Sequence, residues 1–438
     1  MITALGFLMV ATFMVLIMTR RMTALVALIL IPVLFGVVAG FAPKLGPMML
    51  DGIKSLAPTG VMLMFAILYF GLMTDVGLFD PVVRRLVKAV HGDPMKVSLG
   101  TVALTAMIAM DGDGSTTYVI TTAALLPLYD CLGMSRRRLC CLVMTTTGLI
   151  NIIPWGGPTA RAASALRLDA SDLFTPMVPA MLAGIAFMFF VAWVFGRSER
   201  TRLGVVGADQ LPDIDTLCAP SNPAIRRPKL FWVNALITVA LLVCLVLAVV
   251  PLPILMMLAF SITMIVNYPN LQDQKDRVAA HAPNVLAVVS LIFAAGIFTG
   301  ILNGTGMVEG MSRSVVALVP APLGPYLAPI TAALSLPFTF FISNDAFYYG
   351  VLPILAEAGA HYGITPAEIA RASLIGQPFH QASPLVPATY LLVTLAGVDL
   401  ADHQKTTLKW CVAVAVVMTL VAIATGAFPL FHLATAPS

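Results

Sequence analysis

Two short polar stretches in an otherwise apolar sequence contain the residue types most able to do chemistry. The first is MDGDGSTTY, residues 110–118, which places Asp111 and Asp113 two positions apart among glycine and hydroxyl residues. The second is SND, residues 343–345, which also lies between apolar segments. Carboxylate oxygens are hard ligands that suit Mg²⁺ or Ca²⁺, and carboxyl groups inside membranes also serve as proton carriers. These stretches therefore predict sites for cations or protons.

Two further polar stretches interrupt longer apolar segments: NIIPWGGPTARAAS at residues 151–164 and GQPFHQASPLVP at residues 376–387. Their prolines and glycines do not continue a regular helix, so each segment predicts a broken helix. The free N–H groups at a helix N-terminus attract carboxylates. Arg161 adds a planar guanidinium that can hold a carboxylate through two hydrogen bonds. This combination suits a polyanion that is carried together with cations.

The candidate binding residues belong to these four stretches. For the anion they are Ser115, Thr116, Thr117, Asn151, Gly156, Gly157, Thr159, Arg161, Ser343, Asn344, Ser383 and Thr389. For metal or proton coupling they are Asp111, Asp113, Asp345 and His380. Structural roles stay open as alternatives. The aspartates of the first stretch and Ser343–Asn344 can be helix caps, Arg161 can be the counter-ion of one of those two aspartates, and His380 can be a hydrogen-bonded packing residue.

The composition of the chain indicates where these stretches lie. Of its 438 residues, 59% are hydrophobic and only 11% are charged, whereas a soluble domain has about 25% charged residues. Apolar runs of about 20 residues recur from end to end and predict transmembrane helices. The six cysteines show neither metal-ligand spacing nor a disulfide framework. The sequence therefore predicts an all-α polytopic protein in a lipid bilayer.

The two halves of the chain share one predicted order of elements: three full helices, a re-entrant hairpin, a broken helix and a closing helix. In the first half, residues 1–196, these are predicted at 2–19, 22–41, 56–78, 98–131, 139–166 and 173–196. In the second half, residues 230–438, they are predicted at 230–250, 252–268, 283–302, 326–360, 370–398 and 408–428. Residues 197–229 form a polar linker. Each half thus has five transmembrane helices, one of them broken, and one hairpin.

An internal repeat supports this division. YFGLMTDVGLF from Tyr69 aligns with FTGILNGTGMV from Phe298, with Gly71 on Gly300, an offset of 229 residues. Because five crossings are an odd number, the two halves have opposite orientation, which predicts inverted-topology repeats. Of the 25 Lys and Arg residues, 19 fall on the side of the linker and five on the other. This asymmetry predicts a cytoplasmic linker and outward-facing termini.

The stretches DGDGSTTYVITTAALLPLY, NIIPWGGPTARAAS, SNDAFYYGVLPILAE and GQPFHQASPLVPATYLLV resemble those of the citrate–divalent metal–proton symporter family of the ion transporter superfamily. The resemblance covers essentially the whole chain. The plan is also similar to that of the divalent anion–sodium symporters, whose hairpin tips carry Ser-Asn-Thr. Here the second tip has Asp345 in place of the threonine, and the first tip has Asp113-Gly114-Ser115-Thr116. Sodium coupling therefore does not carry over.

The resemblance implies uptake of citrate complexed with a divalent metal, driven by protons, across the bacterial inner (cytoplasmic) membrane. The metal, such as Mg²⁺ or Ca²⁺, would be a co-substrate, and no resident cofactor is implied. The superfamily also suggests an elevator-like motion and a homodimer. Neither an enzymatic activity nor a nucleic-acid partner is expected.

Other functions stay open. Proton-coupled transport of another di- or tricarboxylate without metal is the main alternative, and a channel or exchanger for an inorganic anion uses a related fold. An intramembrane aspartyl protease is a third, but that design needs two aspartates on separate helices and a Gly-x-Gly-Asp motif. Asp111 and Asp113 lie in one loop and do not match it.

Overall fold

The computed structural model describes residues 2–19, 21–81, 85, 92–205, 223–246, 250–318 and 320–432. Throughout these ranges the regular structure is helical, and they contain no strand. Among the described residues, six helices are long and apolar enough to cross a membrane. The prediction of an all-α chain is confirmed.

The first half contains the two arms of the predicted hairpin, α5 and α6, and the two parts of the predicted broken helix, α7 and α8. Its described α-helices, in chain order, are α1 (Ile2–Met18), α2 (Ala24–Val38), α3 (Leu45–Val76), α5 (Pro94–Ile108), α6 (Gly114–Cys131), α7 (Arg136–Ile150), α8 (Gly157–Leu166), α9 (Ala170–Phe174) and α10 (Val178–Leu203). The two arms have 15 and 18 residues. At 1.5 Å per residue, neither is longer than a hydrocarbon core of about 30 Å.

The second half shows a corresponding order. Its described elements are α12 (Phe231–Val246), α13 (Leu252–Asn267), α14 (Leu271–Gly304), α15 (Met307–Leu318), α16 (Leu327–Phe341), the π-helical turn η8 (Ala346–Val351), α17 (Leu352–Ala360), α18 (Pro366–Leu374), α19 (Gln377–His380), α20 (Pro387–Ala396) and α21 (Leu400–Ala424). Here α16 and α17 correspond to the arms of the predicted second hairpin, and α18 to α20 correspond to the parts of the predicted second broken helix.

Some helices are longer than the sequence predicts. Helix α3 begins at Leu45 and not at residue 56, and α14 begins at Leu271 and not at residue 283. The α14 extension is polar, and the α3 extension has Asp51 and Lys54 among apolar residues, so neither matches an uninterrupted apolar membrane span, yet both continue the helix. Helix α10 likewise runs to Leu203, into the predicted linker. Residues 206–222 of that linker and 433–438 of the predicted second half lie outside the described residues.

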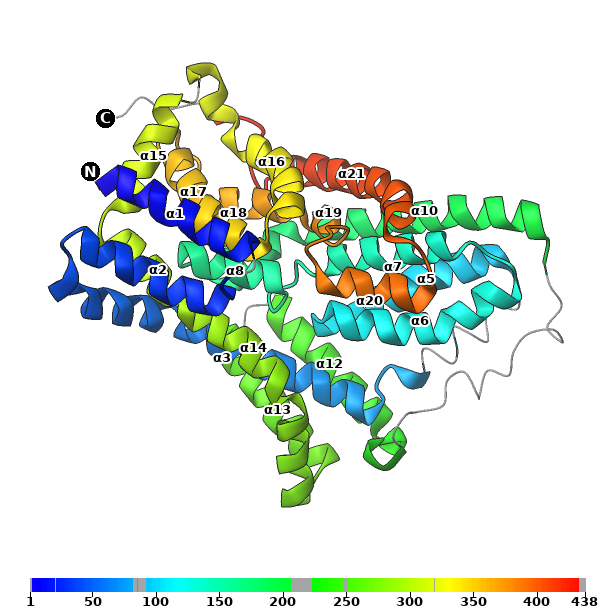
Figure 1. Ribbon diagram of the computed structural model, residues 1–438. Helices are drawn as coiled ribbons and strands as arrows, with labels where there is room; N and C mark the ends of the chain where they lie inside the picture. Colours follow the sequence, from blue (N-terminus) through cyan, green and yellow to red (C-terminus); the bar gives the residue numbers. More distant parts are fainter. Residues whose placement is uncertain are drawn as a thin grey trace.

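Elements of the two halves interdigitate. In Figure 1 the cyan helices α5, α6 and α7 lie near the orange and red helices α20 and α21, and the contacts pair α20 with α6, α21 with α7, and α21 with α10. Among the described helices, α3 and α14 form the most extensive pair. The elements with the polar stretches therefore come together from both halves beside this pair.

Glycine allows α3 and α14 to approach closely. A Cβ atom added at Gly52 would lie 1.9 Å from the carbonyl oxygen of Gly296, and one added at Gly300 would lie 2.3 Å from the carbonyl oxygen of Met48. Gly296 and Gly300 are four residues apart and therefore lie on one face of α14. Small residues at such spacing let two membrane helices pack backbone to backbone. This crossing sets the position of one wall of the cavity described below.

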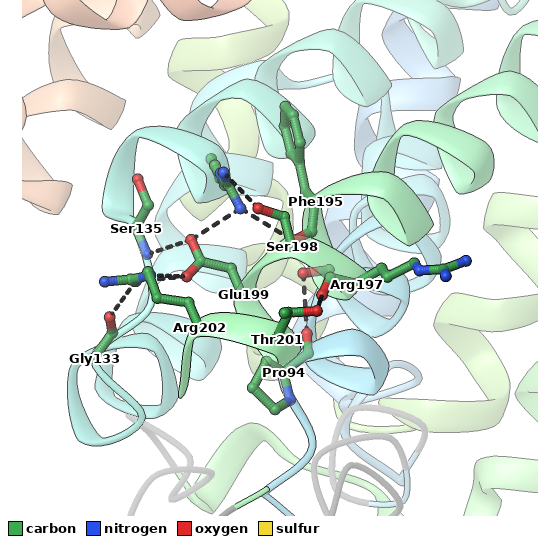
Figure 2. A network of polar contacts seen from close by, with 11 residues as sticks. Pro94, Gly133, Ser135, Phe195, Arg197, Ser198, Glu199, Thr201 and Arg202 are labelled. Atoms are coloured by element: carbon green, nitrogen blue, oxygen red, sulfur yellow. Dashed lines mark hydrogen bonds and ion pairs between the residues drawn. The ribbon is translucent and has the colours of Figure 1, made fainter. Parts of the chain in front are cut away.

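A buried carboxylate fixes the start of α7 against the end of α10 (Figure 2). The Glu199 side chain is 2% exposed and accepts hydrogen bonds from the backbone N–H of Ser135 at 3.2 Å and from Nε of Arg202 at 3.0 Å. Arg138 lies 3.2 Å from the same carboxylate. A buried charge is costly unless it is paired, and Glu199 has several partners. The cluster thereby holds the first broken helix in place at its start.

Candidate functional site

The tip of the first hairpin, residues 109–113, is a tight turn in which both aspartates accept backbone hydrogen bonds. Asp111 Oδ1 accepts from the N–H of Asp113 at 2.8 Å, and Gly112 between them has a φ of 80°, where glycine is favoured. Asp113 is the N-cap of α6. Its carboxylate accepts from the N–H groups of Ser115 and Thr116 at 3.0 and 3.1 Å and from the Thr116 hydroxyl at 2.5 Å. The capping role considered for Asp113 is therefore present.

The break in the first broken helix packs against this tip. The indole Nε1 of Trp155 donates to the carbonyl oxygen of Met110 at 2.8 Å. Within the break, the Thr159 hydroxyl donates to the carbonyl oxygen of Ile152 at 2.7 Å. A Cβ atom at Gly156 would lie 2.0 Å from the carbonyl oxygen of Asn151, so glycine is required. Helix α8 then begins directly beside the first tip.

Arg161, in the second turn of α8, pairs with the tip of the second hairpin, residues 342–345. Its Nε donates to Asp345 Oδ1 at 2.6 Å, and the two side chains are 25% and 18% exposed. A second contact between the same elements joins the hydroxyl groups of Ser164 and Tyr349 at 3.1 Å. The counter-ion alternative for Arg161 named an aspartate of the first tip, and this was wrong. The partner belongs to the other half of the chain.

The second tip is held by the second broken helix. Asn344 and Gln377 exchange side-chain hydrogen bonds at 3.3 and 3.4 Å, and Gln377 also donates to the hydroxyl of Tyr348 at 2.8 Å. Ser343 accepts from the N–H of Ala346 at 3.1 Å, which is the capping arrangement considered from the sequence. Asn344 is therefore positioned by an amide pair that spans 33 residues of chain.

Three predicted site residues of the second broken helix lie against or donate to backbone carbonyl groups. His380 is buried and its Nδ1 lies 2.5 Å from the carbonyl oxygen of Thr339, as expected of a packing histidine. Ser383 donates to the carbonyl oxygen of Phe340, and Thr389 to that of Gln381, each at 2.6 Å. These bonds occupy the hydroxyl protons of both residues. They fix the shape of the break.

A cavity of about 260 Å³ lies between the first tip and the α3–α14 pair. On one wall are the predicted residues Asp111, Asp113, Thr116, Gly157 and Arg161, joined by Gly112 and Trp155. On the other are Ile67, Gly71 and Thr74 of α3 and His281, Asn284, Ala287 and Val288 of α14. The structure places the other predicted residues outside this lining: Ser115, Thr117, Asn151, Gly156, Thr159, Ser343, Asn344, Asp345, His380, Ser383 and Thr389. Of these, Asp345 forms an ion pair with Arg161, which lines the cavity.

Comparison with known proteins gives this site a context. The profile of the citrate transporter family matches residues 7–376. The chain is 55% identical over 426 residues to a citrate transporter of Bacillus subtilis (strain 168), which covers 97% of this chain and 99% of that one. It belongs to the citrate transporter family. It is also 51% identical over 428 residues to the Mg²⁺/citrate complex secondary transporter of the same organism, with 98% and 99% of the two chains covered. The family membership suggested by the four stretches is confirmed.

Solved structures of low sequence identity share the fold. The Neisseria gonorrhoeae MtrF structure has a TM-score of 0.65 at 14% identity, covering 92% of this chain and 88% of that one. The Alcanivorax borkumensis YdaH transporter has a TM-score of 0.58 at 13% identity, covering 90% of each. Together with the six long apolar helices, this likeness shows a multi-pass membrane protein with a transporter fold.

The residues on the α14 side of the cavity are not among those predicted from the sequence. His281 lies in the polar segment before the helix predicted at 283–302, and Asn284 is the second residue of that predicted helix. Arg277, His281, Asn284 and Val288 are spaced by four, three and four residues, which places them on one face of a helix. That periodicity was the available signal, and it extends the helix backwards through the polar residues.

The charges around the cavity are unevenly distributed. Arg161 is paired with Asp345, and Asp75 of α3 lies against both Arg277 and His281 of α14. Asp111 and Asp113 have hydrogen-bond donors in the tip backbone, and the described residues show no ion pair for either. The cavity therefore combines an anchored guanidinium with two carboxylates, which suits a ligand that is itself both anionic and cationic.

Proposed function

We propose that this protein imports citrate as a complex with a divalent metal ion such as Mg²⁺, coupled to protons, by alternating access across the bacterial cytoplasmic membrane. The observation that carries the proposal is the cavity that places Arg161 together with Asp111 and Asp113. Near-full-length identity of 51% to a Mg²⁺/citrate complex secondary transporter supports the choice of substrate.

The charges of the cavity favour a metal complex over the free anion. Free citrate carries about three negative charges at neutral pH, and two ionised aspartates at the same cavity would repel it, as like charges do. A magnesium–citrate complex carries about one net negative charge, because the metal neutralises two. The metal can face the oxygen atoms of Asp111 and Asp113, since Mg²⁺ and Ca²⁺ prefer oxygen ligands. The free carboxylate end can then face Arg161.

The first turn of α8 contributes to the anion side of this arrangement. Gly157 and Arg161 both line the cavity, and a Cβ atom at Gly157 would lie 2.7 Å from the Arg161 guanidinium. The guanidinium thus lies over the helix N-terminus, where free N–H groups also attract anions. The Arg161–Asp345 pair uses Nε, which leaves the terminal nitrogens of the guanidinium for a carboxylate.

We propose alternating access because the cavity has two walls that belong to different groups of elements. The first tip and α8 form one wall, while α3 and α14 form the other. The paired order of elements in the two halves supports the proposal of two inverted-topology repeats, 1–196 and 230–438, with a cytoplasmic linker at 197–229. Movement of the hairpins and broken helices relative to α3 and α14 would then expose the cavity to one side at a time.

The function is tested with the purified chain in proteoliposomes. Uptake of labelled citrate is measured under an imposed inward proton gradient, with EDTA or with Mg²⁺ or Ca²⁺ added. We expect accumulation that requires both metal and the gradient. Equal uptake in EDTA would refute the metal complex and favour metal-free transport of a polycarboxylate, which remains the second candidate because Arg161 binds carboxylates with or without a metal.

A further inference from the structure

The α14 wall of the cavity contains a histidine that the proposed function does not use. His281 Nε2 lies 2.9 Å from Asp75 Oδ2, and NH1 of Arg277 donates to the same oxygen at 3.2 Å. All three side chains are partly buried, with exposed fractions of 17 to 18%. His281 lines the cavity across from the first tip. It is therefore a titratable group fixed at the site by a carboxylate of the neighbouring helix.

The contact with Asp75 determines which nitrogen can serve a ligand. An ionised carboxylate only accepts hydrogen bonds, so Nε2 donates and carries a proton. The remaining nitrogen, Nδ1, has a lone pair in neutral imidazole and a second N–H group in imidazolium. A Cβ atom at Gly71 would lie 2.6 Å from Nδ1, and Gly71 itself lines the cavity. Because residue 71 has no side chain, none stands between Nδ1 and the cavity that both residues line.

Protonation of His281 adds a positive charge to the α14 wall of the cavity. The nearby guanidinium groups already have carboxylate partners: Arg277 contacts Asp75 and Arg161 contacts Asp345. Neutral His281 presents a lone pair at Nδ1, which repels a carboxylate. Protonated His281 presents an N–H donor and a positive charge, which bind one. Histidine is also the side chain that ordinarily gains and loses a proton between about pH 5 and 8.

We propose that His281 is a proton-dependent binding residue for a substrate carboxylate, so that the anion and a proton bind to the α14 wall together. The inference rests on the proposed function and adds a second anion contact opposite Arg161. Several charged or titratable groups lie around His281. Asp75 and Arg277 contact each other beside it, and Asp111, Asp113 and Arg161 line the same cavity. Further out are Tyr268 at the end of α13 and Arg226, whose NH1 donates to the Thr74 carbonyl at 2.6 Å.

The decisive variant is His281→Gln, because the glutamine amide can still donate to Asp75 but cannot take up a proton. Magnesium–citrate exchange is measured in proteoliposomes with equal pH on both sides, so that no proton gradient drives the reaction. For the wild type we expect KM to fall as the pH decreases between about pH 8 and 5. For His281→Gln we expect KM at the acidic end to rise roughly tenfold or more, with little pH dependence and a nearly unchanged maximal rate.

Two further variants keep the test decisive. His361→Gln, at an exposed position after α17, should keep the wild-type KM at every pH and shows the effect of losing a histidine elsewhere. If His281→Gln does not reconstitute, Gly71→Ala leaves His281 in the chain but places a methyl group against Nδ1, and it should raise the acidic KM in the same way. A wild-type pH profile in the reconstituted variant overturns the inference alone. Absence of magnesium–citrate exchange in the wild type overturns the proposed function and the inference with it.

Discussion

Arg161 and Asp345 form an ion pair across 184 positions of the chain, with Nε 2.6 Å from Oδ1. The pair joins the first broken helix to the tip of the second hairpin, and the guanidinium also lines the cavity. One residue thus connects the two halves of the protein at the point where the substrate is proposed to bind. A substitution at either position tests both the connection and the site.

Arg161→Lys should lose most transport although the positive charge is kept. The lysine ammonium is a single point charge and cannot contact Asp345 and a substrate carboxylate with separate nitrogens, as a planar guanidinium can. We expect a rise in the KM for magnesium–citrate of roughly ten- to hundredfold, the value of one or two hydrogen bonds to a charged group. A near-normal KM in Arg161→Lys and Arg161→Ala would assign Arg161 to structure alone. Melting temperatures in detergent identify variants that have lost the fold.

Asp113→Asn separates the cap of α6 from the proposed coupling role. Asparagine is as good an N-cap as aspartate, whereas alanine removes the cap at a cost of about 1 kcal/mol. Asparagine keeps one of the two acceptor oxygens, so Asp113→Asn should lose less stability than Asp113→Ala. It should still abolish proton-driven accumulation, while exchange of preloaded substrate persists. Asp113→Ala should lower the melting temperature as well.

Both activities are measured in the same proteoliposomes, and Asp111→Asn is tested in parallel. If each of the two asparagine variants still accumulates citrate against its gradient, the carboxylates of the first tip are structural. The coupling proton would then be carried elsewhere, with His281 the next residue to examine.

The crossing of α3 and α14 should not tolerate side chains. In Gly52→Ala the new methyl group would overlap the Gly296 carbonyl, and the backbones must separate. Overpacking of this kind costs about 1–3 kcal/mol, so we expect a lower melting temperature in detergent. Gly46→Ala is the matched control, because it lies in the same helix and a Cβ atom there meets nothing within 4 Å. Equal stability of the two variants would show that the helices do not pack this closely.

The tips and breaks can be predicted from the sequence for a physical reason. Aspartate, glycine and proline inside an apolar segment are costly unless they serve a turn or a site, so their positions stand out sharply. The described boundaries of α5, α6, α7 and α8 place the turn at residues 109–113 and the break at 151–156, inside the stretches that were singled out.

The partners and the second wall could not be predicted in this way. Nothing in the local sequence indicates that Arg161 meets Asp345 and not a nearer aspartate, because that choice depends on how the halves pack. His281 was missed because α14 starts in a polar segment, Leu271 to Ala282, where hydropathy carries no signal of a membrane helix. Such a segment forms a helix when it packs against another element. Here Arg277 and His281 of this segment contact Asp75 of α3.

Single-cysteine labelling tests the proposed inverted repeats. Thr201 and His361 are exposed, and they lie near the end of α10 and just after α17. With five crossings in each half, a cysteine at Thr201 should react with a membrane-impermeant maleimide only from the cytoplasmic side, and one at His361 only from outside. Cys131 is exposed as well, so it is replaced by serine beforehand, and the cysteine-replaced parent protein must remain unlabelled in intact cells. If both positions react from the same side, the two halves do not have opposite orientation. The cavity would then need a different route to alternating access.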